Sequence, residues 1–187
     1  MDLVTLDTPH HEILRQQAHE VHLPLNAQDK AFIESMRKFF DVLESSIHKP
    51  AGLAAPQVGK SLRVIIINVP PDATKYRKFV YDTIPPTILI NPSYTPIIKE
   101  GQTKDWEGCY SVTDKMGEVY RYNAIRYEAY SFDGKKITAV AKGFLARVIQ
   151  HEVGHINGKL YIDLLCSDCR YCAIYKMMAI RKKEMSL

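Results

Sequence analysis

The sequence predicts an α+β fold in which antiparallel or mixed β-sheets surround one central helix, with a further helix at the C-terminus. Short β-branched or alternating runs separated by turn residues indicate strands, and the turn signal at 132–135 predicts an antiparallel hairpin. Apolar residues at helical spacing over 143–158 indicate the central helix. The 187 residues are 46% hydrophobic and 25% charged, which is typical of one globular domain, here 1–187.

In the N-terminal half, a thin apolar stripe predicts a short helix over 9–19, and a broad stripe predicts the longest helix over 26–48, ending before Pro50. The segment 70–86 is expected to be an exposed insertion or hairpin. The expected strands are 62–69, 87–90 and 95–99, and the last is placed at a sheet edge because it contains Pro96.

In the C-terminal half, alternating residues predict strands over 118–122, 124–131 and 137–140. The central helix follows and is expected to end near Gly158. The tail, 166–187, carries apolar and basic residues and is predicted to form a basic, partly amphipathic helix.

The composition limits the classes of partner and compartment. A formal net charge of +4 is too small for a nucleic-acid footprint, and no apolar run approaches transmembrane length. The first residues show no secretion signal, so we expect a cytoplasmic protein whose four cysteines are thiols or metal ligands. Three of them, Cys166, Cys169 and Cys172, form an incomplete ligand set and are expected to remain thiols.

The central helix contains the H-E-x-x-H pattern His151-Glu152-Val153-Gly154-His155. Positions i and i+4 share a helix face, so both imidazoles can reach one metal ion. The carboxylate between them can handle the proton of a metal-bound water. Three fixed letters are a weak signal, and an amphipathic helix with two structural histidines explains them as well.

Two other stretches carry chemistry-bearing residues. In 51–59, small residues and two glycines allow a close backbone approach, and Gln57 is an uncharged donor suited to an oxyanion. In 105–111, Cys109 beside Gly108 is a candidate thiolate ligand. A tight loop and a small buried hydrophobe are the respective alternatives.

Taken together and in this order, three stretches resemble the peptide deformylase family, whose members remove the N-formyl group from nascent bacterial polypeptides. They are Gly52-Leu53-Ala54-Ala55-Pro56-Gln57, Glu107-Gly108-Cys109-Tyr110-Ser111 and His151-Glu152-Val153-Gly154-His155. The resemblance covers roughly residues 10–165, and the joint pattern is far more specific than H-E-x-x-H alone. The long segment between the first two stretches resembles the deformylase subgroup that carries an insertion there.

The resemblance implies one divalent metal ion per chain, held by Cys109, His151 and His155. It implies Fe²⁺ as the native ion, while the donor set also suits Zn²⁺, Ni²⁺ or Co²⁺. It further implies that Glu152 takes a proton from metal-bound water and delivers it to the leaving amine.

For substrate, the resemblance implies formylated nascent peptides, whose oxyanion would be held by the Gln57 side chain and the backbone N–H of Tyr110. The backbone near Gly52 would pair with the peptide as an added strand. We expect the basic tail to dock on the ribosome, with no membrane partner and no sequence-specific nucleic acid. The residues implied to contact the substrate are Gly52, Leu53, Glu107, Gly108, Arg121, Phe144, Arg147 and Val148.

Four residues depart from the family pattern: Pro50, Tyr110, Gly154 and Arg147. Arg147 lies one turn before His151, at a position that the resemblance assigns to the pocket for the first substrate side chain. An arginine there is expected to extend outward, to pair with an acid or to narrow the pocket. We therefore expect an altered preference at the first substrate residue.

Two other functions fit parts of the sequence. A zinc peptidase of the H-E-x-x-H type needs a third ligand downstream, but the metzincin position holds Tyr161, and Glu184 lies in the basic tail. A peptidase also leaves the stretch around Cys109 unexplained. A non-catalytic relative that binds N-termini or the ribosome fits the departures, but it does not explain why all four catalytic residue types are present.

Overall fold

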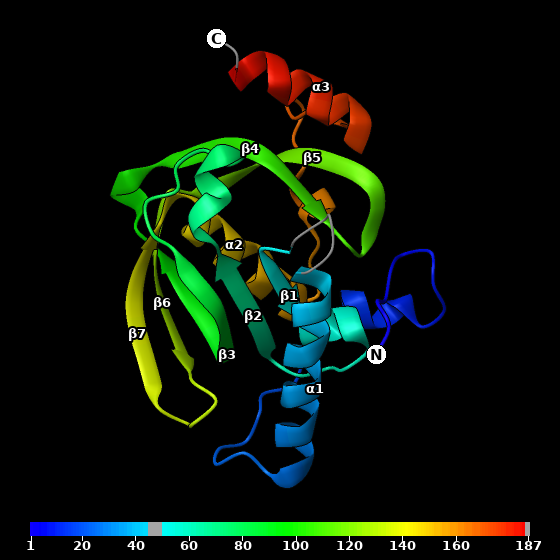
Figure 1. Ribbon diagram of the computed structural model, residues 1–187, viewed down its shortest axis with the longest axis vertical. Coiled ribbons are helices and arrows are strands. Elements are labelled where there is room, and N and C mark those ends of the chain that lie inside the picture. The colour runs from blue at the N-terminus through cyan, green and yellow to red at the C-terminus, as the bar shows by residue number, and fades with distance from the viewer. Residues whose placement is uncertain (45–49, 186–187) are drawn as a thin grey trace.

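The computed structural model describes residues 1–44 and 50–185, and two antiparallel sheets enclose its helix α2, Gly143–Ile156 (Figure 1). The larger sheet has the strand order β1-β2-β3-β6-β7, and the smaller has the order β4-β5-β8. This confirms the predicted α+β fold, with antiparallel sheets around the helix that carries H-E-x-x-H and a helix at the C-terminal end. In the described ranges, no helix is long and apolar enough to cross a membrane.

The larger sheet consists of β1 (Gly52–Ala54), β2 (Val64–Val69), β3 (Ile84–Pro96), β6 (Ala124–Tyr130) and β7 (Lys136–Lys142). The smaller sheet consists of β4 (Gln102–Cys109), β5 (Val112–Tyr122) and β8 (Tyr171–Ala173). The other two α-helices are α1 (Ala27–Glu44) and α3 (Ile174–Met185).

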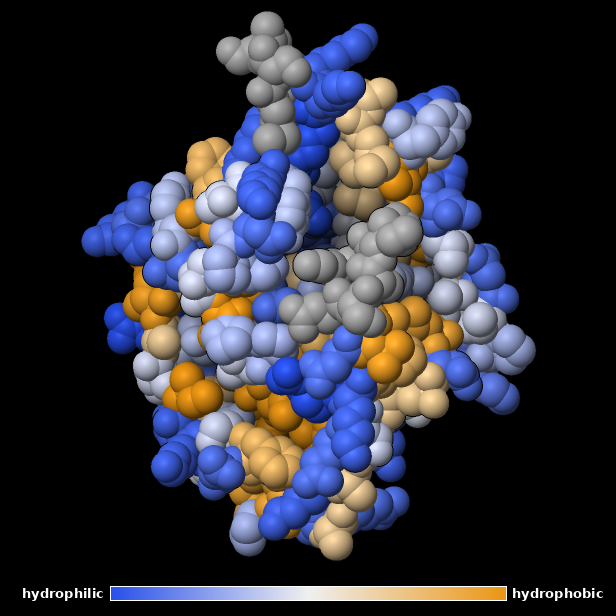
Figure 2. Space-filling model, in the orientation of Figure 1, coloured by the Kyte–Doolittle hydropathy of each residue, from blue (hydrophilic) through white to orange (hydrophobic). Residues whose placement is uncertain are grey.

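Strand β2 organises the larger core because it is covered on both faces. Successive side chains of a strand point to opposite faces. Ile65 and Ile67 pack in the cluster that contains the apolar residues of α2, whereas Val64 and Ile66 pack with the α1 residue Phe40. A continuous apolar run is therefore required in β2, and all six of its residues are buried. Figure 2 shows apolar side chains gathered beside α1 on the outer side of this sheet.

Helix α3 packs on the smaller sheet. Its Met177 forms a buried cluster with Trp106 of β4 and Met116 of β5. Strand β8, which pairs with β5, leads directly into α3 and sets its position above the sheet (Figure 1).

Several predicted elements differ from the structure in the N-terminal half. The helix expected over 9–19 is only a 3-10 turn, His11–Arg15, and the expected end of the 26–48 helix lies outside the described residues. The strand expected over 87–90 and the first two residues of the one expected over 95–99 are parts of one strand, β3, and a 3-10 turn begins at Ile98. Asn91, with a φ of 50°, permits a bulge between Ile90 and Ser93, after which the strand continues.

The edge position expected for Pro96 is partly right. Strand β3 lies in the middle of the sheet, but β2 pairs with it only from Ile84 to Ile90. Pro96 pairs with Ile125 of β6 on one side and, among the described residues, has no strand on its other side. Pro96 has no N–H to donate, but as the last residue of β3 it removes little hydrogen bonding from the sheet. The exposed insertion expected over 70–86 is also only partly right, because Ala73 is buried and the last residues belong to β3.

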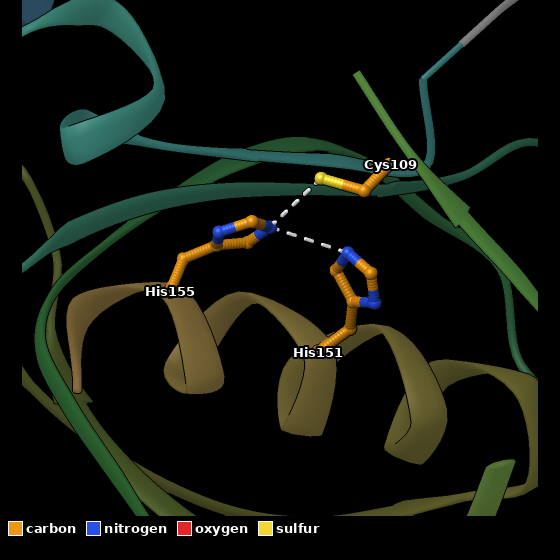
Figure 3. A group of neighbouring side chains, drawn as sticks. All are labelled: Cys109, His151 and His155. Atoms are coloured by element: carbon orange, nitrogen blue, oxygen red, sulfur yellow. Dashed lines mark hydrogen bonds between the residues drawn. The ribbon is translucent and has the colours of Figure 1, made fainter. Parts of the chain in front are cut away.

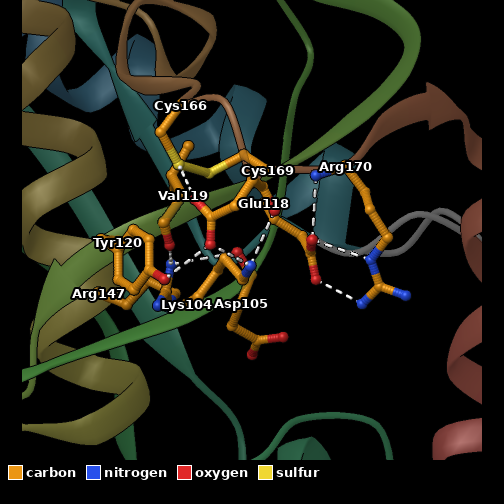
Figure 4. The surroundings of a disulfide bond; sticks show 10 residues. Lys104, Asp105, Glu118, Val119, Tyr120, Arg147, Cys166, Cys169 and Arg170 are labelled. Atoms are coloured by element: carbon orange, nitrogen blue, oxygen red, sulfur yellow. Dashed lines mark hydrogen bonds and ion pairs between the residues drawn. A yellow bond between two sulfur atoms is a disulfide. The ribbon is translucent and has the colours of Figure 1, made fainter.

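The tail, 166–187, was predicted as one helix, but it begins with a turn and β8, and α3 starts only at Ile174. The prediction that Cys166 and Cys169 remain thiols was wrong, because they form a disulfide (Figure 4). The turn in which Cys169 N–H donates to Cys166 O brings both side chains together. Cys172 is a free thiol.

We expect Gly143→Ala to destabilise the fold more than Gly134→Ala. Both glycines have a positive φ, which alone costs a side chain roughly 1–2 kcal/mol. At Gly143 a Cβ would also collide with the carbonyl oxygen of Phe79 and the ring of Tyr81, whereas nothing lies within 4 Å at Gly134. Urea denaturation of both variants measures the difference in their free energies of unfolding. Equal decreases would show that the backbone around Gly143 shifts to accommodate the Cβ.

Candidate active site

Three side chains converge beside α2 (Figure 3). His151 and His155 lie one turn apart on α2, and Cys109 approaches from the end of β4. Cys109 Sγ lies 3.2 Å from His155 Nε2, and this nitrogen lies 3.3 Å from His151 Nε2. One ligand atom from each residue falls within 4.8 Å of the others, so the group can share one ion.

The chemistry of this group fits a divalent metal ion. A thiolate and two imidazoles form a donor set suited to Zn²⁺, Fe²⁺, Co²⁺ or Ni²⁺. His151 Nδ1 is 2.8 Å from Glu107 Oε2 and donates to it, which leaves Nε2 as the electron-pair donor facing Cys109 and His155. The ligand tautomer is thus set by a residue outside the ligand group.

Glu107 is buried and binds three cationic or polarised side chains. Its carboxylate accepts both bonds of the Arg121 fork, at 3.0 and 2.9 Å, and a bond of 2.7 Å from Arg147 Nη1. Burial opposes ionisation, but the charge of Arg121 and the hydrogen bonds from His151 and Arg121 hold the pKa of Glu107 well below its usual range. The carboxylate is therefore ionised and holds the ring of His151 in place through its hydrogen bond to Nδ1.

The carboxyl group of Glu152 has an unused oxygen. Oε2 is buried and has no hydrogen-bond partner in the described part of the chain. A Cβ at position 52 would collide with this side chain, so Gly52 provides the space that it occupies. Burial raises the pKa of Glu152 to about 7, against the opposing effect of His151 and His155. A carboxyl group with this pKa can both accept and release a proton near neutral pH.

Gln57 is oriented by the loop that follows β1. Its Oε1 accepts a hydrogen bond of 2.8 Å from Ala54 N–H, so its amide nitrogen faces the other way. Nε2 then lies 3.2 Å from Cys109 Sγ and 3.4 Å from Ser111 Oγ. The carboxamide is buried and presents its donor end to the Cys109 sulfur.

These side chains open onto a groove with a cavity volume of about 490 Å³. Of the predicted contact residues, Leu53 and Arg121 do not line it: Leu53 is fully buried, and Arg121 lies behind Glu107. The predicted residues that do line it are Gly52, Gln57, Glu107, Gly108, Cys109, Tyr110, Phe144, Arg147, Val148, His151 and Glu152.

Arg147 pairs with an acid, which is one of the three outcomes expected for it. Besides its bond to Glu107, Nη1 donates to Val119 O at 3.1 Å, and Nη2 donates to Thr103 O at 2.6 Å. Its guanidinium thus joins α2 to β4 and β5 while also lining the groove.

Sequence reasoning missed several other residues of the groove wall. Arg77 comes from the segment between β2 and β3, and Ile174, Met177 and Met178 come from α3. No local pattern marks them, because each reaches the groove only through long-range packing. Arg77 lies in a run of polar and charged residues that is typical of an exposed loop.

Two histidines of an H-E-x-x-H helix, a cysteine from a neighbouring strand and a carboxyl group beside them in a groove are the residue types of a mononuclear metallohydrolase. The model of the polypeptide deformylase family matches residues 3–170, and the chain belongs to this family. Its members are metal-dependent enzymes that remove the formyl group from the N-terminal methionine of nascent peptides, and this is the activity of the chain.

The chain is similar to several curated deformylases. It is 39% identical to peptide deformylase 2 of Rickettsia conorii, over 99% of this chain and 90% of that protein. It is 37% identical to peptide deformylase 1 of Prochlorococcus marinus, over 86% of this chain and 83% of that protein.

Solved structures show the same fold. The class I type b enzyme of Acinetobacter baumannii matches with a TM-score of 0.72 and 25% identity, over 88% of this chain and 99% of that one. The Synechococcus elongatus enzyme in complex with actinonin matches with a TM-score of 0.71 and 28% identity, over 90% of this chain and 80% of that one.

We expect Arg147→Met to lower the free energy of unfolding by about 2–3 kcal/mol, because Glu107 keeps the Arg121 fork but loses a buried charged hydrogen bond. Thr103 O and Val119 O also lose a donor. Urea denaturation measures this loss against Arg126→Met, which removes an exposed arginine from β6. If the free energy of unfolding falls no more than it does in Arg126→Met, Arg147 does not stabilise the contact of α2 with β4 and β5.

Proposed function

We propose that this chain hydrolyses the formyl amide of nascent N-formylmethionyl peptides with Glu152 as the acid–base group and Cys109, His151 and His155 as metal ligands. The observation that carries this assignment is the position of Glu152. Its side chain lines the groove next to the ligand group, and its Oε2 is buried and has no hydrogen-bond partner in the described ranges.

The metal site is assigned to one ion per chain, and Fe²⁺ is proposed as the native ion because the family resemblance implies it. When bound, a divalent cation supplies a Lewis acid that lowers the pKa of a coordinated water. The protein's contribution is orientation: Glu107 holds His151 through Nδ1, and Gln57 directs an N–H towards Cys109 Sγ.

In the proposed reaction, Glu152 takes the proton of the attacking water at Oε2. As the C–N bond of the formyl amide breaks, the same oxygen delivers the proton to the departing amine nitrogen, so the products are formate and a free amino terminus. The Gln57 Nε2–H and the backbone N–H of Tyr110 donate to the formyl oxygen as its negative charge develops. Removing one such donor typically costs on the order of 10²–10³ in rate.

The substrate chain is proposed to lie along β1. Among the described residues, this strand pairs only with β2, so its other edge is open there, and Gly52 lines the groove. Phe144, Arg147 and Val148 are assigned to the wall around the first side chain. Leu53 and Arg121, which lie outside the groove, are assigned to support from behind.

We also propose that the chain works in the cytoplasm, where its nascent substrate emerges, and that α3 docks on the ribosome. Lys176, Lys182 and Lys183 of α3 are exposed, and basic side chains of this kind bind the phosphates of RNA.

For the reaction, we expect protein loaded anaerobically with Fe²⁺ to release formate from formyl-Met-Ala-Ser. Glu152→Ala should lower the rate by about 10²–10⁴ because the proton carrier is lost, with metal content unchanged. Cys109→Ala should instead lose the metal, which elemental analysis measures. Full turnover by Glu152→Ala, or full metal content in Cys109→Ala, would assign the chemistry to other residues.

For the docking, we expect replacement of Lys176, Lys182 and Lys183 by glutamine to weaken co-sedimentation with ribosomes and to reduce its salt dependence. The matched control replaces Lys30, Lys38 and Lys135, which are exposed on α1 and in the hairpin turn. Equal binding by both triple variants would reject α3 as the docking element.

A further inference from the structure

Three arginines converge on Asp105 and Trp106 in β4: two contact the backbone, and one contacts the Asp105 carboxylate. Arg77 Nη1 lies 3.5 Å from Trp106 O, and Arg147 Nη1 lies 3.5 Å from Asp105 O. Arg181 of α3 lies 3.6 Å from Asp105 Oδ1 through Nη1. The group gathers side chains from three separate segments at one end of the groove.

The carboxylates of the region do not balance these charges. Glu107 is shared by Arg121 and Arg147, and Asp105 faces Arg181. Arg77 has no carboxylate within 4.0 Å in the described part of the chain. Burial and the charge of Arg181 lower the pKa of Arg77, against the opposing effect of Asp105 and Glu107.

Buried donors beside Arg77 also lack acceptors. Arg181 is only 9% exposed, and its Nε and Nη2 have no hydrogen-bond partner among the described residues. Trp106 Nε1 is buried without a partner as well. Buried polar groups are normally hydrogen-bonded. All three unpaired atoms are donors, so the missing group is an acceptor.

The cluster is continuous with the active site. Arg77, Trp106, Phe144 and Met177 line the same groove as Cys109. The guanidinium of Arg77 lies 5.1 Å from the centroid of the Phe144 ring, so its position is fixed by stacking. A molecule that reaches Arg77 therefore occupies the groove together with the reacting amide.

We propose that Arg77, supported by Arg181 and the indole N–H of Trp106, forms a subsite for a carboxylate side chain of the substrate peptide. This inference rests on the proposed function. A glutamate or aspartate at the second or third residue would place its methylene groups against Phe144 and Met177 and its two oxygens on the Arg77 fork. Acidic residues after the methionine are then favoured substrates, and basic ones are disfavoured.

The first test compares kcat/KM for formate release from two peptide pairs: formyl-Met-Glu-Ser with formyl-Met-Lys-Ser, and formyl-Met-Ala-Glu-amide with formyl-Met-Ala-Lys-amide. We expect the acidic member of at least one pair to be favoured on the order of tenfold or more, as a charge-assisted bond allows, and less so at high salt. Arg77→Gln should bring the ratio close to one, and Arg77→Lys should give an intermediate ratio. Lys78→Gln, the matched control, removes the adjacent exposed charge and should keep the ratio.

A second readout does not depend on turnover. Trp106 is the only tryptophan, so its fluorescence reports binding at the cluster directly. The deformylated peptide Met-Glu-Ser should change this signal at lower concentration than Met-Lys-Ser, and Arg77→Gln should remove the difference. Circular dichroism confirms that the variant is folded.

The outcomes separate the two proposals. If no formate is released from formyl-Met-Ala-Ser, the proposed function is overturned. The fluorescence titration then still tests whether the subsite binds a carboxylate. Normal turnover with no preference in either peptide pair overturns the subsite alone. Inhibition by free acetate that disappears in Arg77→Gln, without any preference among peptides, would show that the cluster binds a free carboxylate and would overturn its role in substrate selection.

Discussion

The buried carboxylate of Glu107 is the interaction on which the site depends. It joins Arg121 of β5 with Arg147 and His151 of α2, while Glu107 itself belongs to β4. A buried charge is tolerated only when it is paired and hydrogen-bonded, so these contacts must form together. Since Cys109 lies two residues beyond Glu107 on the same strand, the network that neutralises the carboxylate also sets the distance between the cysteine and histidine ligands. Folding of the core and assembly of the site are thus one event.

The parts of the structure that were predicted correctly have local signals. Three elements have a local hydrophobic pattern that matches their secondary structure: helix α1, strand β2 and the H-E-x-x-H helix. In each, most of the residues that the pattern marks as apolar pack in the core. The spacing of His151 and His155 on one helix face made them candidate ligands, and the resemblance to the deformylase family added Cys109 to the set. The structure brings Cys109, His151 and His155 together, with Gln57 beside them.

The parts that were missed depend on contacts between distant segments. The residues of β4, Gln102–Cys109, have weak apolar alternation, and the strand exists because β5 and α3 supply its partners. Asn91 resembled a strand end, but its positive φ only bends β3. The resemblance implied that Arg121 contacts the substrate; in the structure its guanidinium binds Glu107, fourteen residues away on the neighbouring strand. No local sequence pattern around Arg77 indicates that its side chain lines the groove.

Strand β1 has only three residues, and one of its edges is already taken by β2. A strand this short can form main-chain hydrogen bonds with only a few residues of a bound peptide. These hydrogen bonds do not depend on the side chains of the peptide. An enzyme that binds its substrate along β1, as proposed for this chain, would recognise only the first few residues of a polypeptide through their main chain. It can therefore serve an entire proteome with one groove, while its short open edge offers little template for association with other copies of itself.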